Sequence, residues 1–199
     1  RGGYKIIIGG SEKIAEKIRQ AYTAQGLRAF DVDFMSKVYE RPFEVEHVAF
    51  KDAPETREAA APVGRHLDGC RIGFDAGGSD RKVSAVIDGE AVYSEEVVWH
   101  PKINSDPMYH YNGILEAMKS AASHMPRVDA IGVSSAGVYV NNRIMVASLF
   151  LKVPQDEFDK KVKNMYLDVA KEICDVPVEV ANDGDVTALA GARDLNDGG

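Results

Sequence analysis

The chain has 199 residues, which is enough for one domain or two small ones. Hydrophobic residues make up 45% of it, a proportion that lets a globular protein bury a core. The formal net charge of -7 argues against a nucleic-acid partner, because such partners require a basic surface. Two cysteines are too few for a disulfide framework, and no apolar run approaches the roughly 20 residues of a membrane span, so we expect a cytoplasmic protein with no membrane partner.

The first 68 residues predict a small α/β segment. Residues 5–10 form an apolar, β-branched run closed by two glycines, which indicates a short buried strand. A helix with one apolar face follows, and two further strands are expected around residues 29–34 and 45–50. Prolines and a glycine between residues 51 and 69 are typical of a linker, so we place a domain boundary near residue 68. The role of this segment stays open.

Residues 69–199 follow a clearer pattern. Three strands come first, with Asp88-Gly89 as a hairpin turn between the second and the third. These three can run antiparallel, whereas helical crossovers make the later strands parallel, so we expect an α/β fold with a mixed sheet. The expected strands are residues 70–74, 82–87, 91–98, 130–133, 138–140, 144–147 and 176–180, and the expected helices are residues 107–123, residues 154–174 and a last helix from residue 185.

The first segment with chemical potential is Asp75-Ala76-Gly77-Gly78-Ser79, at the end of an apolar strand. Its glycines can adopt positive φ and let backbone N–H groups approach a phosphate oxygen, and Ser79 adds a hydroxyl donor. Asp75 can hold Mg²⁺ through water, because magnesium keeps most of its hydration shell. The alternative is an ordinary Gly-Gly hairpin whose aspartate satisfies turn amides.

The second segment is Asn182-Asp183, which follows another apolar strand about a hundred residues later. Asp183 can accept a proton from a hydroxyl that attacks the γ-phosphate of ATP, and Asn182 can hydrogen-bond neighbouring hydroxyls. Helix capping is the alternative, because Asp183 or Asp185 can satisfy free N–H groups of the next helix.

Taken together, three segments resemble the ROK family of the actin/hexokinase superfamily: residues 72–79, 130–137 and 177–183. The resemblance covers about residues 69–199 and implies a ribonuclease-H-like sheet, the N-terminal lobe of a kinase whose C-terminal lobe is missing from this chain. It implies ATP-dependent phosphorylation of a hexose or amino-sugar hydroxyl, with ATP and Mg²⁺ as cofactors. By the same resemblance, the phosphate loop consists of Asp75, Gly77, Gly78 and Ser79, with Asp75 as the metal ligand. The catalytic base is Asp183. The sugar contacts are Asn182 and Gly137.

The loop around Asn141-Asn142 does not resemble the family's sugar-specificity loop, which leaves the substrate open, and two other segments depart from the family pattern. Ser134-Ser135-Ala136-Gly137 stands where a Pro-Gly pair is usual, and Gly184-Asp185 replaces the commoner Ala-Asn. The alternative function is a non-catalytic sugar-sensing regulator or pseudokinase of the same fold. Residues 1–68 lack the basic recognition helix of a DNA-binding repressor, so we expect a small-molecule sugar as the partner and no nucleic acid. The identity of the sugar and the presence of a homodimer stay open.

Overall fold

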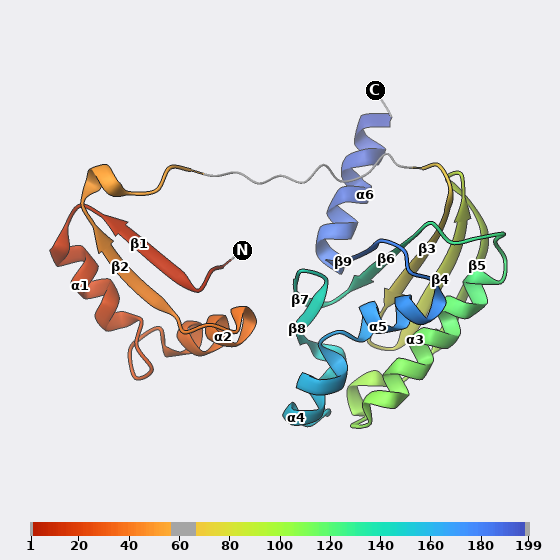
Figure 1. The fold of residues 1–199 in the computed structure, drawn as a ribbon, viewed down its shortest axis with the longest axis horizontal. Helices are drawn as coiled ribbons and strands as arrows, with labels where there is room; N and C mark the ends of the chain where they lie inside the picture. The colour runs from red at the N-terminus through yellow and green to blue at the C-terminus, as the bar shows by residue number, and fades with distance from the viewer. Residues whose placement is uncertain (1, 57–66, 198–199) are drawn as a thin grey trace. The chain divides into compact units, whose positions relative to one another are not determined.

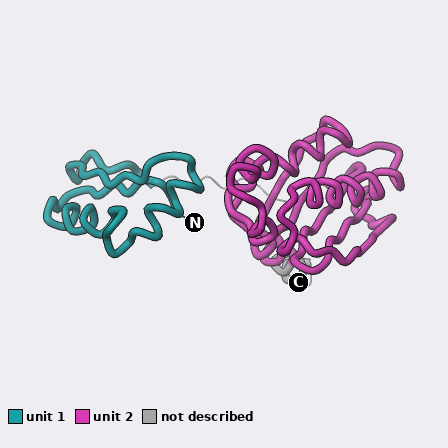
Figure 2. Tube along the Cα trace, turned by 90° about the horizontal axis from the view of Figure 1, so that it is seen from below, with its two compact units in different colours: residues 1–63 teal, residues 64–199 magenta. Residues whose placement is uncertain are grey.

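The computed structural model describes residues 2–56 and 67–197, with side chains described up to residue 190. The chain divides into two compact units, residues 1–63 and 64–199 (Figure 2). The predicted linker falls largely on residues 57–66, outside the described residues. No helix in the described part of the chain is long and apolar enough to cross a membrane.

Unit 1 contains two parallel strands that are connected by two helices. Its elements are β1 (Lys5–Gly9), α1 (Glu12–Ala21), α2 (Ala29–Tyr39), β2 (Glu44–Val48) and a 3-10 turn, η1 (Phe50–Asp52). The strands predicted at residues 5–10 and 45–50 are confirmed as β1 and β2, within two residues at each end. The strand predicted at residues 29–34 is wrong, because these residues belong to α2.

Contacts at helical spacing explain why α2 is a helix. Val38 is buried, and the half-buried Phe34 lies one turn before it on the same face. Lys37 Nζ donates a hydrogen bond of 2.7 Å to Asp33 Oδ2, an i,i+4 pair of opposite charge. Apolar residues at every second position from Phe30 also suit a strand, so the pattern of hydrophobicity alone did not distinguish the two conformations.

Unit 2 is built on a five-stranded mixed sheet (Figure 1). Its strands are β3 (Cys70–Ala76), β4 (Asp80–Ile87), β5 (Glu90–Val98), β6 (Ala130–Ser135) and β9 (Val178–Asn182). In space their order is β5-β4-β3-β6-β9, with β3, β4 and β5 antiparallel and with β6 parallel to both β3 and β9. The predicted mixed sheet is therefore confirmed. The predicted tight turn is also confirmed, since Asp88 and Gly89 both have positive φ.

Two helices, α3 (Pro107–Ala122) and α5 (Met165–Ile173), pack against each other and against the sheet. α3 begins at a capping residue, since Asp106 Oδ1 accepts a hydrogen bond of 2.9 Å from the backbone N–H of Met108. A third helix, α6 (Asp183–Asp197), follows β9 directly and contacts β6 and β9. The core includes the fully buried side chains of Ile72, Trp99, Ile114, Met118, Ile131 and Tyr166.

The helix predicted at residues 154–174 is interrupted. It consists of α4 (Gln155–Glu157), a π-helical turn labelled η4 (Phe158–Val162), and α5. The break follows from a contact with β8 (Arg143–Ala147), where the backbone N–H of Ile144 donates a hydrogen bond of 2.8 Å to the carbonyl oxygen of Lys163. That carbonyl leaves the regular helical ladder, which the periodicity of the apolar residues could not reveal.

The strands predicted at residues 138–140 and 144–147 are confirmed as β7 (Gly137–Val140) and β8, which pair as an antiparallel hairpin. Its turn residues, Asn141 and Asn142, both have positive φ, as a two-residue hairpin turn requires. Asn142 also fixes the hairpin to the main sheet. Its Nδ2 donates to Val178 O at 2.8 Å, and its Oδ1 accepts from the N–H of Val180 at 2.9 Å.

Candidate active site

The carboxyl ends of three neighbouring strands bring the two acidic segments to one edge of the sheet. In the register of the sheet, Asp75 on β3 lies opposite Ser134 on β6, and Ser134 lies opposite Ala181 on β9. A cavity of about 640 Å³ lies at this edge. It is lined by Asp75, Ala76, Gly77, Gly78, Lys102, Ser134, Ala136, Ser148, Leu149, Asp183, Val186 and Thr187. Residues from both predicted motifs therefore share one cavity.

The two glycines of the β3–β4 loop are needed for space rather than for an unusual backbone conformation. Neither Gly77 nor Gly78 has a positive φ, so that expectation is wrong. A Cβ on Gly77 would lie 2.6 Å from the carbonyl oxygen of Asp80, and a Cβ on Gly78 would lie 2.6 Å from Lys102 Nζ. A side chain at position 77 would therefore collide with the backbone of the loop, and one at position 78 would collide with the present position of the Lys102 ammonium group.

Trp99 holds the glycine loop in place through two hydrogen bonds. Its indole Nε1 donates a hydrogen bond of 2.8 Å to Gly77 O, and its backbone N–H donates one of 3.0 Å to Ser79 O. The ring is buried, with 2% of its surface exposed. Two hydrogen bonds from one residue at the end of β5 thus fix both ends of the loop.

The Asn182-Asp183 pair combines capping with exposure to the cavity. α6 begins at Asp183, two residues earlier than predicted. The backbone N–H of Gly184 donates to Asn182 Oδ1 and to Asp183 Oδ1, at 2.9 Å in each case. Asn182 Nδ2 donates to Gly137 O at 3.0 Å, which ties β9 to β7. The predicted cap is therefore present, and the Asp183 carboxylate also lines the cavity.

Three of the predicted site residues lie outside the cavity lining. Asn182 uses its amide as described above, and Gly137 lies in β7, next to Ala136 of the lining. Ser79 is exposed, and its hydroxyl lies 3.4 Å from Asp80 Oδ2. The structure thus brings together Asp75, Gly77, Gly78 and Asp183.

Several residues of the cavity were not among the predicted site residues. Thr187 was within reach, since it follows Asp183 by one helical turn and lies on the same face of α6. Ser134 belongs to β6, which extends two residues beyond the predicted strand at residues 130–133. Lys102 and Ser148 come from the short turns η2 (Pro101–Ile103) and η3 (Ser148–Phe150), and no local motif marks either of them.

A buried histidine connects these two turns. His110 of α3 is fully buried, and its Nε2 lies 3.0 Å from Pro101 O and 3.2 Å from Leu149 O. Its Nδ1 lies 3.1 Å from Asp106 O at the start of the same helix. One imidazole therefore holds together the segments that carry Lys102 and Ser148.

Two tyrosines with buried hydroxyl oxygens, Tyr139 and Tyr166, interact electrostatically with the acidic residues. Burial raises the pKa of Tyr139 to about 12, and the carboxylate of Asp183 adds to the rise. Burial also raises the pKa of Tyr166, with a smaller contribution from Asp75. Both phenols are therefore neutral at physiological pH.

The donors at this cavity fit a nucleotide and a magnesium ion better than a metal held by protein alone. No group of three or more metal-ligating side chains occurs among the described residues. Magnesium at phosphoryl-transfer sites takes one or two carboxylates and completes its shell with water and substrate phosphate, which Asp75 suits. Gly77 and Gly78 also line the cavity, and glycines suit the close approach of an anion to the backbone.

No protein-family model matches the chain, and no curated protein matches it in sequence. In structure, the chain is similar to the inorganic polyphosphate/ATP-glucomannokinase from Arthrobacter sp. strain KM, with 21% identity, a TM-score of 0.47, and coverage of 63% of this chain and 49% of that chain. It is similar to Lmo2764, a putative N-acetylmannosamine kinase from Listeria monocytogenes, with 24% identity, a TM-score of 0.41, and coverage of 57% and 35%. It is similar to the ROK hexokinase from Thermus thermophilus, with 17% identity, a TM-score of 0.42, and coverage of 57% and 35%. The likeness is one of fold, to sugar kinases of which this chain spans about half the length or less.

Proposed function

We propose that residues 69–199 form the N-terminal lobe of a ROK-family kinase that transfers a phosphoryl group from ATP to a hexose or amino sugar. One observation supports this proposal above all. Asp75, Gly77 and Gly78 line the same cavity of about 640 Å³ as Asp183, although about a hundred residues separate the two segments. Alone, each segment has an ordinary structural explanation; together they supply a phosphate cradle and a carboxylate at one edge of a sheet.

In this proposal the glycine loop binds the donor phosphates. Gly77 and Gly78 have no side chain of their own, so their backbone N–H groups would be able to approach phosphate oxygens. Asp75 would hold Mg²⁺ through water, and the exposed hydroxyl of Ser79 would donate to a phosphate oxygen. The bound magnesium ion would neutralise charge on the transferred phosphoryl group.

Asp183 is the proposed general base. It accepts the proton of the attacking sugar hydroxyl, a contribution of about 10²–10⁴ in rate for a well-placed base. Asn182 and Gly137 are the proposed sugar contacts, and the hydrogen bond of 3.0 Å between them would give the sugar side of the site a fixed wall. Further ATP and sugar ligands would come from a C-terminal lobe, because the chain spans about half of the solved kinases or less. A cytoplasmic location remains a prediction, and the presence of a homodimer stays open.

The test is sugar-dependent ADP release by the full-length protein over a panel of hexoses and amino sugars. Asp183→Asn is compared with Asp185→Asn, which removes a carboxylate two residues further on, outside the cavity lining. We expect turnover with one sugar to fall by about 100-fold or more in Asp183→Asn alone, with sugar and Mg-ATP affinities nearly unchanged. Wild-type turnover in that variant would refute the assignment of the base. Sugar binding without turnover in the wild type would favour the sensor or pseudokinase.

A further inference from the structure

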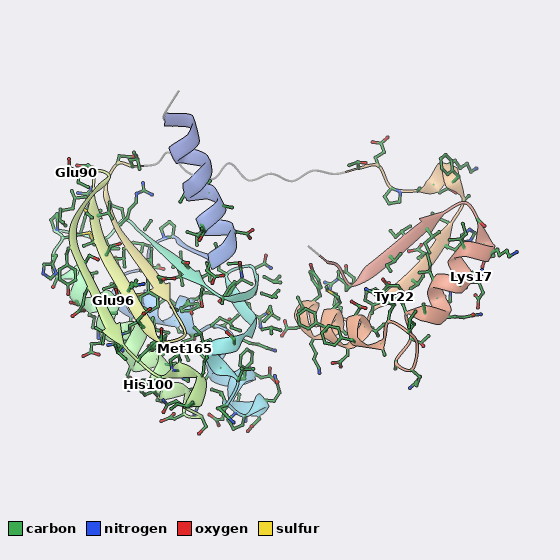
Figure 3. The ribbon with its side chains drawn as sticks, turned by 180° about the vertical axis from the view of Figure 1, so that it is seen from behind. Lys17, Tyr22, Glu90, Glu96, His100 and Met165 are labelled. Carbon is green, nitrogen blue, oxygen red and sulfur yellow. The ribbon has the colours of Figure 1, made fainter. Side chains whose placement is uncertain are left out.

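Lys102 lines the cavity and belongs to the turn η2, which follows the outer strand β5. β5 is antiparallel to β4, and β4 is antiparallel to β3, so β5 and β3 run in the same direction. Figure 3 shows Glu90 and Glu96 on β5 and His100 beyond the end of that strand. η2 follows His100 directly, and Lys102 therefore lies at the same edge of the sheet as the carboxyl end of β3.

The side chain of Lys102 lies over the glycine loop. A Cβ on Gly78 would come within 2.6 Å of both Cε and Nζ of this lysine. The ammonium group is thus next to the loop that we propose as the phosphate cradle, and only a glycine at position 78 leaves room for it there.

Lys102 has no ion-pair partner among the described residues. Within the described residues, none of the carboxylates forms an ion pair with its Nζ, and no other cation lines the cavity. The two cations next to the glycine loop in sequence are already paired. Arg81 forms an ion pair of 2.8 Å with Glu116, and Lys82 lies 3.8 Å from Asp80.

The backbone that carries Lys102 is held on both sides. His110 Nε2 lies 3.0 Å from the carbonyl oxygen of Pro101. Asn104 Nδ2 donates a hydrogen bond of 2.7 Å to His100 O, and Tyr109 Oη accepts one of 2.8 Å from the N–H of His100. The lysine therefore extends into the cavity from a fixed turn rather than from a free loop.

We propose that Lys102 binds a phosphate group of the phosphoryl donor at the glycine loop. The inference rests on the proposed function and adds a residue to it. A polyphosphate chain that enters a cavity lined by two carboxylates, Asp75 and Asp183, needs a compensating cation besides the metal ion. An unpaired lysine ammonium next to the backbone cradle supplies such a charge, as a point charge with three N–H donors.

The test is calorimetric binding to the full-length protein, with Mg-ATP, Mg-tripolyphosphate and adenosine as separate probes. The variants are Lys102→Met, Lys102→Arg and, as the matched control, Lys82→Met, which removes a cation near the loop but outside the cavity lining. We expect Lys102→Met to weaken Mg-ATP and Mg-tripolyphosphate by about tenfold, the effect of one charge-assisted hydrogen bond. Adenosine affinity should stay within about twofold, Lys102→Arg should restore most of the phosphate affinity, and Lys82→Met should bind like the wild type.

Each contrary outcome has a distinct meaning. Wild-type Mg-ATP affinity in Lys102→Met, combined with weakened affinity in Gly78→Val, would overturn the role of Lys102 and leave the proposed function intact. An equal loss of adenosine and Mg-ATP affinity in Lys102→Met would also overturn it, because the lysine would then act on the fold. A wild-type protein that binds none of the phosphate probes would overturn both proposals.

Discussion

The indole N–H of Trp99 donates a hydrogen bond of 2.8 Å to the carbonyl oxygen of Gly77. This contact joins a buried aromatic ring at the end of β5 to a loop whose own side chains are too small to hold it in place. A second hydrogen bond, from the backbone N–H of Trp99 to Ser79 O at 3.0 Å, holds the other end of the loop. The glycine loop is therefore organised by the sheet, before any ligand is present.

Trp99→Phe should loosen this loop. The substitution keeps an aromatic ring in the core but leaves Gly77 O without its donor, at a cost of about 1–3 kcal/mol in the free energy of unfolding. We also expect weaker Mg-ATP binding, since the loop loses its fixed conformation. Urea denaturation and calorimetry measure the two effects. Tyr93→Phe is the control, because it removes a hydrogen bond of 2.8 Å to Ser120 Oγ, away from the cavity lining. Equal effects of both variants on Mg-ATP affinity would contradict the role of Trp99.

Alanine substitutions at Gly77 and at Gly78 should affect the free energy of unfolding to different extents. At Gly77 the new Cβ meets a backbone oxygen, Asp80 O, at 2.6 Å, so we expect the free energy of unfolding to fall by about 1–3 kcal/mol. At Gly78 the Cβ meets the flexible end of Lys102, which can move aside at little cost in stability. Thermal or urea unfolding of the two variants distinguishes these cases.

The same pair separates folding from binding. Gly78→Ala should keep nearly wild-type stability and still weaken Mg-ATP, because it displaces Lys102 from the loop. If Gly78→Ala bound Mg-ATP as tightly as the wild type, neither the cradle nor the lysine would need a glycine there. If Gly77→Ala were as stable as the wild type, the loop would be more adaptable than its contacts indicate.

The contact between α3 and α5 should make stability depend on acid. Lys119 Nζ and Tyr111 Oη donate hydrogen bonds of 2.8 and 2.7 Å to the Glu172 carboxylate and hold its pKa below the usual value. The same carboxylate raises the pKa of Tyr111 to about 12. A lowered pKa stabilises the fold above the unfolded-state value of about 4.3, and this contribution disappears as the pH falls through the folded-state value.

Glu172→Gln should therefore flatten the loss of stability on acidification. We expect the urea midpoint of the wild type to fall more than that of the variant as the pH decreases below about 4.3. Glu96→Gln, an exposed position on β5, is the control and should follow the wild-type curve. Parallel curves for the wild type and Glu172→Gln would show that this ion pair adds nothing to folding.

Much of the fold of unit 2 could be predicted because its signals are local. The tight turns at Asp88-Gly89 and Asn141-Asn142 join strands close in sequence, and their positive φ values suit the residues found there. The element at residues 29–34 could not be predicted in this way, because a strand and a helix both suit its apolar residues. The interruption near Lys163 depends on a hydrogen bond from Ile144, which comes from another part of the chain.

The candidate site was predictable only in its two acidic motifs. By itself the sequence determined the mixed sheet and the strand ends that carry Asp75 and Asp183, because strand patterning and tight turns act between near neighbours. Only the tertiary structure decided that these residues share a cavity with Lys102 and that Trp99 holds the glycine loop by a hydrogen bond to Gly77 O. The physical reason is that turns such as η2 are positioned by distant contacts, among them the buried His110, and no local pattern encodes those contacts.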